Sequence, residues 1–247
     1  MQPLSDGAIG LLAYFPAREG LIEELRASLA SIPAAVVEAV SVPDVDWVAP
    51  FREGFRPFVV GSFLIAPPWD VPPSLPPGQH RLIVDPGRAF GTGTHETTRL
   101  CLAALEKLSS GSPLGRTLDL GTGTGILGLA AAALGARLVI GVDDDLEAIA
   151  AARRHARLND SAFHVVLGDG ASPFARASFD LVLANVTATV LLAARDAIAA
   201  VTAPRGTIVL SGLLVEDVTA VREAYSRLGA VGVATEGEWA ALVVTGT

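Results

Sequence analysis

The sequence predicts an α/β protein with a mostly parallel sheet, one antiparallel edge and a small N-terminal α+β module. From about residue 80, short apolar runs alternate with amphipathic windows of ten or more residues, which is the pattern of βαβ units and a parallel sheet. Near the end of the chain, two apolar runs are separated only by Glu236-Gly237-Glu238. Because so short a connection joins antiparallel neighbours, the last two strands are expected to form a hairpin at one edge.

The N-terminal region, residues 1–42, predicts a single strand–helix–strand unit. The expected elements are a strand at Ile9–Phe15, a helix at Arg18–Ser31 and a strand at Ala35–Val42. Two strands alone are marginally stable, so this unit must pack on something. Residues 43–79 hold more than half of the sixteen prolines and predict a linker around one extended stretch, Phe58–Ala66.

The third region, residues 80–247, carries the alternating pattern. The expected strands are His80–Val84, Thr117–Leu120, Arg137–Val142, Phe163–Leu167, Phe179–Ala184, Thr207–Leu210, Ala230–Thr235 and Trp239–Thr245. The expected helices are Glu96–Leu108, Gly125–Leu134, Leu146–Leu158, Thr187–Val201 and Val215–Leu228.

Composition excludes several protein classes. One cysteine, Cys101, and four scattered histidines argue against a disulfide scaffold and a structural zinc site. The longest apolar run, Gly125–Ala136, is too short to span a bilayer, and no signal peptide is recognisable, so a cytoplasmic protein is expected. A net charge of −8, with −5 in residues 1–55, disfavours nucleic-acid binding and suits a basic partner. The alternative is that the acidity only keeps the protein soluble.

A glycine-rich turn, Asp119-Leu120-Gly121-Thr122-Gly123-Thr124-Gly125, separates an apolar strand from an alanine-rich helix. Glycines let the backbone approach a ligand closely, and the helix N-terminus offers free N–H groups. Gly123-x-Gly125-x-x-Gly128, with Asp143 twenty residues after Gly123, also fits the fingerprint of dinucleotide-binding proteins. Against a nicotinamide cofactor, Asp119 would repel a pyrophosphate but could hold an ammonium group.

Polar side chains follow three later strands. Asp143 is placed to accept the hydroxyls of a ribose, Asp169 to reach an adenine amino group, and the amide of Asn185 to point into the same crevice, because ligands bind at the carboxyl ends of parallel strands. The alternative for Asp143 and for Asn185 is a helix cap. Asp144 or Asp145 would cap the following helix equally well, and Thr187 would share that role with Asn185.

A second glycine loop, Asp85–Thr94, precedes a threonine-rich helix start. It lacks the Gly-Lys-Ser/Thr of a phosphate-binding loop, and His95-Glu96 is not followed by the second histidine of a zinc protease. The remaining interpretation is that this loop forms a lid over a ligand and that no metal is involved.

Five motifs occur in one order: Phe90-Gly91-Thr92-Gly93-Thr94-His95-Glu96-Thr97-Thr98, the glycine turn from Asp119 to Gly125, Gly141-Val142-Asp143, Ala184-Asn185-Val186 and Glu236-Gly237-Glu238-Trp239. Together they closely resemble the bacterial methyltransferase of large-subunit ribosomal protein eleven, the PrmA type of class I methyltransferase. The resemblance runs from about Asp46-Trp47 to the end of the chain.

The resemblance implies S-adenosylmethionine as cofactor and a Rossmann-like, seven-stranded sheet in the order 3-2-1-4-5-7-6. It implies lysine side-chain and N-terminal amines of a basic ribosomal protein as methyl acceptors, and a monomer without nucleic-acid or membrane binding is expected. By matching position, Thr98, Gly121, Asp143 and Asn185 would contact the cofactor while the loop closes over it. The expected cofactor-binding residues are Phe90, Gly91, Thr92, Gly93, Thr94, Thr98, Asp119, Gly121, Gly123, Asp143, Asp169 and Asn185, with Asn185 also the expected catalytic residue.

The sequence pattern and the resemblance together predict three regions: a partial ferredoxin-like substrate-recognition module at residues 1–42, the linker at 43–79 and the methyltransferase domain at 80–247. Members of the family carry two βαβ halves in the substrate-recognition domain, whereas residues 1–42 hold only one. A glutamine-amide methyltransferase would need Asn-Pro-Pro-Tyr where Asn185-Val186-Thr187-Ala188 stands. The alternatives kept are a class I methyltransferase for another protein or a small molecule, a cofactor-binding module without ribosomal activity, and a nicotinamide oxidoreductase.

Overall fold

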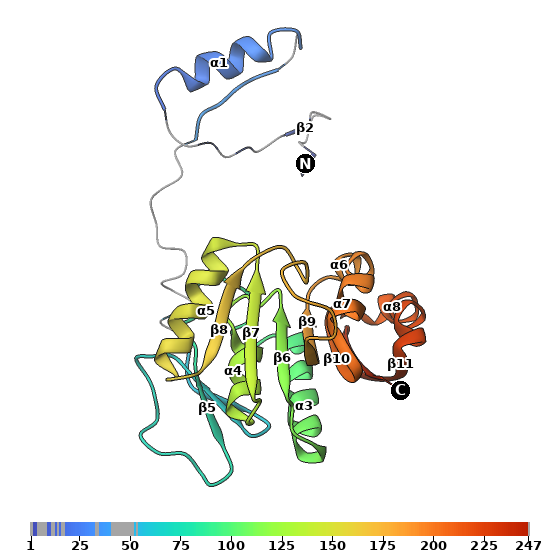
Figure 1. The fold of residues 1–247 in the computed structure, drawn as a ribbon. Coiled ribbons are helices and arrows are strands. Elements are labelled where there is room, and N and C mark those ends of the chain that lie inside the picture. Colours follow the sequence, from blue (N-terminus) through green and yellow to red (C-terminus); the bar gives the residue numbers. More distant parts are fainter. Residues whose placement is uncertain are drawn as a thin grey trace. The chain divides into compact units, whose positions relative to one another are not determined.

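The structure, a computed structural model (Figure 1), describes residues 2–3, 9–10, 13, 15, 18–32, 35–40, 52 and 54–246. The chain divides into two compact units, Met1–Asp46 and Trp47–Thr247. The predicted linker at 43–79 differs from this division, because its later residues belong to the second unit.

Among its described residues, the first unit contains one helix and a short strand pair. Helix α1 spans Leu21–Ser28, and strand β1 (Gln2–Pro3) pairs antiparallel with β2 (Ile9–Gly10). The predicted strand at Ala35–Val42 is wrong over 35–40, where no strand forms, and its last two positions lie outside the described residues. Val36 and Val40 are 81% and 77% exposed, and without burial of the β-branched side chains strand propensity alone does not make a strand.

The second unit is built on a seven-stranded sheet in the order β11-β12-β10-β9-β6-β7-β8. Its strands are β6 (Arg116–Leu120), β7 (Leu138–Asp143), β8 (Phe163–Leu167), β9 (Phe179–Asn185), β10 (Thr202–Leu214), β11 (Gly229–Glu236) and β12 (Trp239–Gly246). β12 runs antiparallel to both β10 and β11, and the other neighbours are parallel. The predicted sheet, its order and its antiparallel edge are confirmed.

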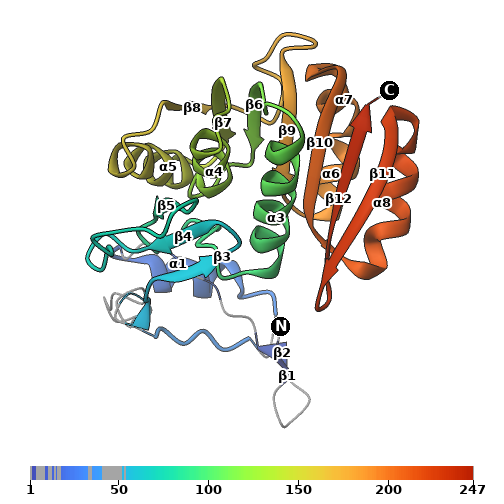
Figure 2. The ribbon, with the colours of Figure 1, turned by 90° about the horizontal axis from the view of Figure 1, so that it is seen from below.

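Helices cover both faces of this sheet (Figure 2). α3 (Glu96–Gly111), α4 (Ile126–Ala133) and α5 (Leu146–Leu158) pack on one face, and α6 (Ala188–Ala193), α7 (Arg195–Val201) and α8 (Val218–Tyr225) on the other. Alternate residues of β9 serve the two cores: Leu181 and Leu183 face α3 and α4, whereas Val182 and Ala184 face α6 and α7. The near-continuous apolar strands of the sequence follow from this burial on both faces.

A second, three-stranded sheet packs on the α3–α4 side (Figure 2). It consists of β3 (Phe58–Val60), β4 (Phe63–Ala66) and β5 (His80–Ile83). The single stretch predicted at Phe58–Ala66 is therefore wrong, because the chain turns at Gly61 and Ser62, where Glu106 of α3 accepts the Ser62 N–H at 3.0 Å. Phe63 and Ile65 are completely buried, so a region punctuated by proline contributes to the core.

The predicted helix Thr187–Val201 is divided at Ala194. The buried hydroxyl of Tyr225 donates a hydrogen bond of 2.8 Å to the carbonyl of Leu191. That carbonyl is thus taken by a side chain instead of by the next helical turn, and an inserted partner of this kind breaks a helix. Likewise, the helix predicted at Val215–Leu228 is α8 between two 3-10 turns, Val215–Asp217 and Ser226–Leu228.

Candidate active site

The glycine turn lies at the carboxyl end of β6 and is braced from inside by Asp119. This carboxylate is 1% exposed and accepts hydrogen bonds from the Thr122 hydroxyl at 2.6 Å and the Gly128 N–H at 3.0 Å. Burial raises the pKa of Asp119 to about 7, against the two hydrogen bonds, and the nearby Asp143 raises it further. In this conformation Asp119 orders the turn, and its expected contact with a ligand ammonium stays a prediction.

Asp143 ends β7 beside the same turn. One carboxylate oxygen accepts the Gly123 N–H at 2.9 Å and the other accepts the Asp145 N–H at 3.1 Å. The cap of α5 is Asp145, whose side chain accepts the Glu147 N–H at 2.8 Å. Asp143 therefore does not serve as the cap; it is half-buried and fixed to the glycine turn, where a carboxylate can still accept from ligand hydroxyls.

Asn185 is the last residue of β9. Its Oδ1 atom is buried and has no hydrogen-bond partner. Helix α6 begins after Thr187, and that helix has no side-chain cap, so capping does not explain Asn185. The turn approaches this point closely, since a Cβ on Gly121 would lie 2.6 Å from a methyl group of Val186, the next residue. Asn185 and the glycine turn are thus brought together.

Thr98 lies in the first turn of α3 and is also an expected cofactor contact. Like Asn185, it has a buried polar atom without a hydrogen-bond partner. The residue is completely buried, and its Oγ1 finds no acceptor or donor. Because an unmade hydrogen bond in the interior costs about 1–3 kcal/mol, a ligand that supplies the missing partner at this position would be stabilised. The hydroxyl of Thr98 and the amide of Asn185 therefore fit a polar cofactor at this edge.

The loop from Phe90 to Thr94 rests directly on the glycine turn. The Thr124 N–H donates to the Phe90 carbonyl at 3.0 Å, and the Thr124 hydroxyl donates to the Gly91 carbonyl. A Cβ on Gly123 would lie 2.5 Å from the same Phe90 oxygen, so only glycine permits this approach. The loop and the turn, which sequence reasoning assigned separately to the cofactor, form one surface.

The far end of the loop is tied to the C-terminal hairpin by Arg99. Its guanidinium donates to the carbonyl of Thr94 and pairs with Glu236 at 2.7 Å. Within the loop, the hydroxyls of Thr92 and Thr94 lie 3.0 Å apart. Gly93 is buried against Ile65 and Ile126. Arg99 and Glu236 were not assigned a role from the sequence, since nothing local indicates that residues so far apart meet.

An aromatic cluster stands beside the loop. The His95 ring lies 5.4 Å from that of Phe90 and 4.7 Å from that of Trp239, edge to face in both cases. Phe90 is 55% exposed. Through this cluster the loop, the start of α3 and the start of β12 form one wall at the carboxyl edge.

His155 is a functional candidate that sequence reasoning missed. The residue is completely buried, with Nδ1 2.7 Å from the Thr124 carbonyl and Nε2 3.0 Å from the Asp85 backbone nitrogen. Burial lowers the pKa of this imidazole, although the backbone contacts oppose the shift. A signal was present, since Ala148, Ala152 and His155 follow the i, i+4, i+7 spacing of a buried helix face.

Asp169 is not brought into this network. It lies on the loop after β8, is exposed, and receives no hydrogen bond on its carboxylate from the described residues. Its expected contact with an adenine amino group stays a prediction.

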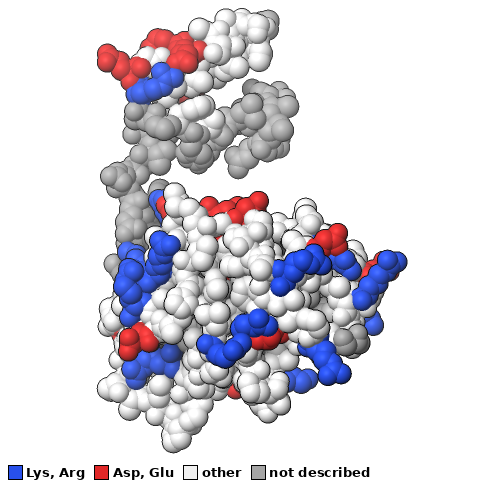
Figure 3. Space-filling model, viewed as in Figure 1, with Lys and Arg blue, Asp and Glu red and all other residues white. Residues whose placement is uncertain are grey.

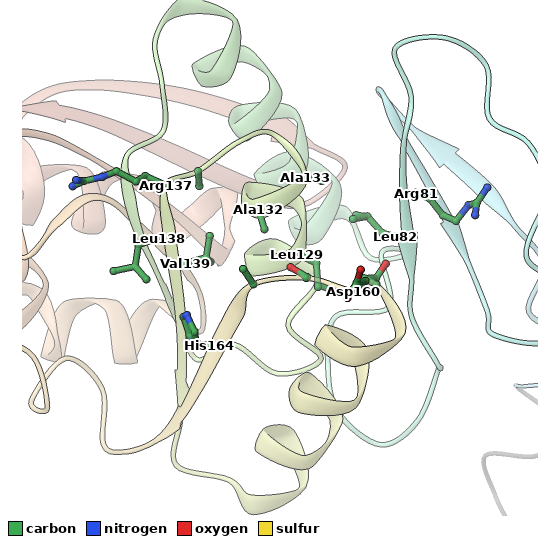
Figure 4. Close-up of a pocket in the computed structure, with 14 residues that line it drawn as sticks. Arg81, Leu82, Leu129, Ala132, Ala133, Arg137, Leu138, Val139, Asp160 and His164 are labelled. Atoms are coloured by element: carbon green, nitrogen blue, oxygen red, sulfur yellow. The ribbon is translucent and has the colours of Figure 1, made fainter.

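A cavity of about 310 Å³ lies at the opposite edge, where β7 and β8 begin (Figure 4). Leu82, Leu129 and Val139 line its apolar part, while Arg81 and Arg137 carry their guanidinium groups away from it on opposite sides. It shares no residue with the glycine turn.

In the part of the chain that the structure describes, no cluster of three or more histidine, cysteine or acidic side chains could hold a metal, and no helix is long and apolar enough to cross a membrane.

Comparisons with known proteins agree with the geometry. A family model described as ribosomal protein L11 methyltransferase (PrmA) matches residues 2–247. Two proteins named ribosomal protein L11 methyltransferase are similar: one from Geobacter sulfurreducens is 44% identical over 87% of this chain and 70% of its own, and one from Geobacter metallireducens is 40% identical over 94% and 80%.

The crystal structure of ribosomal protein L11 methylase from Lactobacillus delbrueckii subsp. bulgaricus superimposes with a TM-score of 0.70 at 26% identity, covering 78% of this chain and all of that one. Sequence and fold thus agree with the motifs at the carboxyl edge of the sheet. The chain belongs to the ribosomal protein L11 methyltransferase family.

Proposed function

We propose that this protein transfers methyl groups from S-adenosylmethionine to lysine and N-terminal amines of ribosomal protein L11. The observation that carries the proposal is the pair of unpartnered buried atoms, Thr98 Oγ1 and Asn185 Oδ1, at two positions expected to contact the cofactor. Family membership supports the reaction and the substrate.

When bound, S-adenosylmethionine supplies an electrophilic methyl group. The residues that would hold the cofactor are those of the glycine turn and the loop Phe90–Thr94, with Asp143 accepting from the ribose hydroxyls and Thr98 satisfied by a polar group of the ligand. The turn and the loop are already joined through Thr124. Such preorganisation keeps the reacting groups aligned, and alignment can supply about 7–11 kcal/mol of a barrier.

The protein must also present the amine without its extra proton. A free lysine has a pKa near ~10.4, and transfer from water into a buried site can lower it by up to about 3–5 units. The amide oxygen of Asn185 can accept a hydrogen bond from the neutral amine and so direct its lone pair at the methyl group. Asn185 is therefore the proposed catalytic residue, acting by orientation and not as a base.

Charge supports a basic substrate. Acidic side chains gather at the rim above the carboxyl ends of the central strands (Figure 3), where Asp144, Asp145 and Glu147 are exposed. Opposite charge speeds the encounter of two proteins. Substrate recognition by residues 1–42, a monomeric state, the absence of nucleic-acid binding and a cytoplasmic location are further parts of the proposal.

The deciding experiment incubates the full chain with methyl-labelled S-adenosylmethionine and unmethylated L11, and compares total ribosomal proteins and free nucleosides as acceptors. Label confined to L11, mapped to lysine and N-terminal amines by mass spectrometry, is the expected result. Label on another protein or a nucleoside would leave a class I methyltransferase with a different substrate. Binding of the cofactor without any transfer would favour a binding module.

A further inference from the structure

The imidazole of His155 is held in one protonation state by its two neighbours. The Thr124 carbonyl, 2.7 Å from Nδ1, can only accept a hydrogen bond, and the Asp85 backbone N–H, 3.0 Å from Nε2, can only donate one. The ring must therefore carry its proton on Nδ1 and keep a lone pair on Nε2. This is a single neutral tautomer, completely buried on the inner face of α5.

These two neighbours are also two attachment points of the loop over the glycine turn. Asp85 begins the segment that follows β5, and Thr124 holds its middle through the carbonyls of Phe90 and Gly91. His155 thus ties the base of the loop to the residue that grips its centre. Removal of the bond to Asp85 would loosen the base of this segment, and removal of the bond to Thr124 would loosen the residue that grips its centre.

The charged groups around the ring act in opposite directions. Arg154 on α5 disfavours a second proton, the Asp85 carboxylate favours it, and the two are themselves paired at 3.1 Å, with Arg52 3.5 Å from the same carboxylate. A protonated ring would direct an N–H from Nε2 at the N–H of Asp85, so the clamp and the imidazolium exclude each other.

We propose that His155 is a positioning residue whose neutral Nδ1–H tautomer clamps residues 85–94 onto the glycine turn and thereby sets the affinity for S-adenosylmethionine. The inference rests on the proposed function for the identity of the ligand. A histidine that only fills the core would affect stability without affecting ligand affinity, whereas a clamp links the two.

Two variants separate the two hydrogen bonds. His155→Asn keeps an amide N–H near the position of Nδ1, for Thr124, and removes the acceptor for Asp85; His155→Gln can keep an acceptor near the position of Nε2 and loses the donor to Thr124. Calorimetry with S-adenosylmethionine should show about tenfold weaker binding for each, the loss expected for one hydrogen bond. Hydrogen exchange without ligand should rise at the Asp85 amide in the first variant and at the Thr124 amide in the second.

The matched control is His164→Asn, the same change at an exposed histidine of β8, which should alter neither measurement. If His155→Asn showed faster exchange at the Asp85 amide but bound S-adenosylmethionine with wild-type affinity, the proposal would be overturned, because a loosened loop would then not affect cofactor binding. If no variant and no wild-type protein bound S-adenosylmethionine, the proposed function would fail, while the exchange data would still test the clamp.

The unmodified protein gives a second test that does not depend on the folding of a variant. Nitrogen chemical shifts of histidine labelled with ¹⁵N should show Nδ1 protonated and Nε2 unprotonated at neutral pH. As pH falls through the titration of His155, affinity for S-adenosylmethionine and protection of the Asp85 amide should decline together. An affinity that stays constant through that titration would refute the clamp.

Discussion

The two sides of the candidate site differ in how completely the chain satisfies its own polar groups. On the side of the glycine turn, the buried groups of Asp119, Thr124 and His155 all have partners within the protein. On the side of β9 and α3, Asn185 Oδ1 and Thr98 Oγ1 are buried with none. A satisfied network rigidifies its surroundings, whereas a buried orphan is costly unless a ligand completes it. The first side is therefore expected to keep its shape before the cofactor binds, whereas the second is expected to be completed by the reactants, and four predictions test that division.

The largest effect is expected from Asn185→Asp. The change keeps the shape of the side chain but adds a negative charge, which favours the ammonium form of the incoming amine, and an ammonium has no lone pair to attack with. Methylation of L11 at pH 7 should fall on the order of 100-fold, with cofactor affinity still measurable. Raising the pH should restore part of the rate.

Thr187→Asp is the control, since it adds the same charge two residues away at an exposed position. Normal activity of Asn185→Asp at pH 7 would contradict the proposed role of Asn185 and would mean that other groups orient the amine.

The next effect concerns the cofactor and Asp143. Asp143→Ala removes an acceptor for the ribose hydroxyls and the bond that holds Gly123. Hydrogen bonds to a charged group contribute about 1.5–3 kcal/mol, so the Kd for S-adenosylmethionine should rise roughly 10- to 150-fold. Calorimetry measures the change, and Asp144→Ala, at the exposed neighbour, should leave the Kd unaltered. A folded Asp143→Ala protein with wild-type affinity would remove the ribose assignment.

A smaller effect distinguishes backbone strain from loop displacement. Gly123 and Gly135 both have positive φ, 54° and 83°, where alanine costs roughly 1–2 kcal/mol. A Cβ at Gly123 would strike the Phe90 carbonyl, whereas a Cβ at Gly135 meets nothing within 4 Å. Urea unfolding should show both alanine variants destabilised, but only Gly123→Ala should also bind S-adenosylmethionine more weakly. If Gly123→Ala and Gly135→Ala bound S-adenosylmethionine with equal affinity, the position of the loop on the glycine turn would not affect cofactor binding.

The last prediction concerns stability alone, through a pH dependence that comes from Asp119. Its pKa is about 7 in the folded protein and ~3.9 in an unfolded chain, so the folded state binds the proton more tightly. The stabilisation is complete below about pH 4 and is lost as pH rises to about 7. Asparagine does not titrate; hence the stability of Asp119→Asn relative to wild type should increase over this window. Parallel urea-unfolding curves from pH 5 to 8 would contradict the shifted pKa.

Much of the fold could be predicted because burial on both faces of a parallel sheet leaves a legible pattern. The strand Phe163–Leu167 and the helix Leu146–Leu158 match their predicted bounds, since the first is a short apolar run and the second a clear amphipathic period. The prediction failed where a distant partner decides the local structure. Tyr225 divides the helix at Ala194, and Glu106 holds the turn that splits Phe58–Ala66 into two strands.

For the site, the sequence by itself determined the order of the motifs, the family they resemble and the placement of Asp119, Asp143 and Asn185 at strand ends, because parallel strands bring their carboxyl ends to one edge. Only the tertiary structure decided which of these side chains the chain satisfies itself. Hydrogen-bond partners such as His155 for Asp85, or Arg99 for Glu236, are far apart in sequence and meet only when the sheet and helices pack. The hydrophobic pattern along the sequence does not indicate such contacts, because they depend on how helices and strands are placed relative to one another and not on the hydrophobic period within one element.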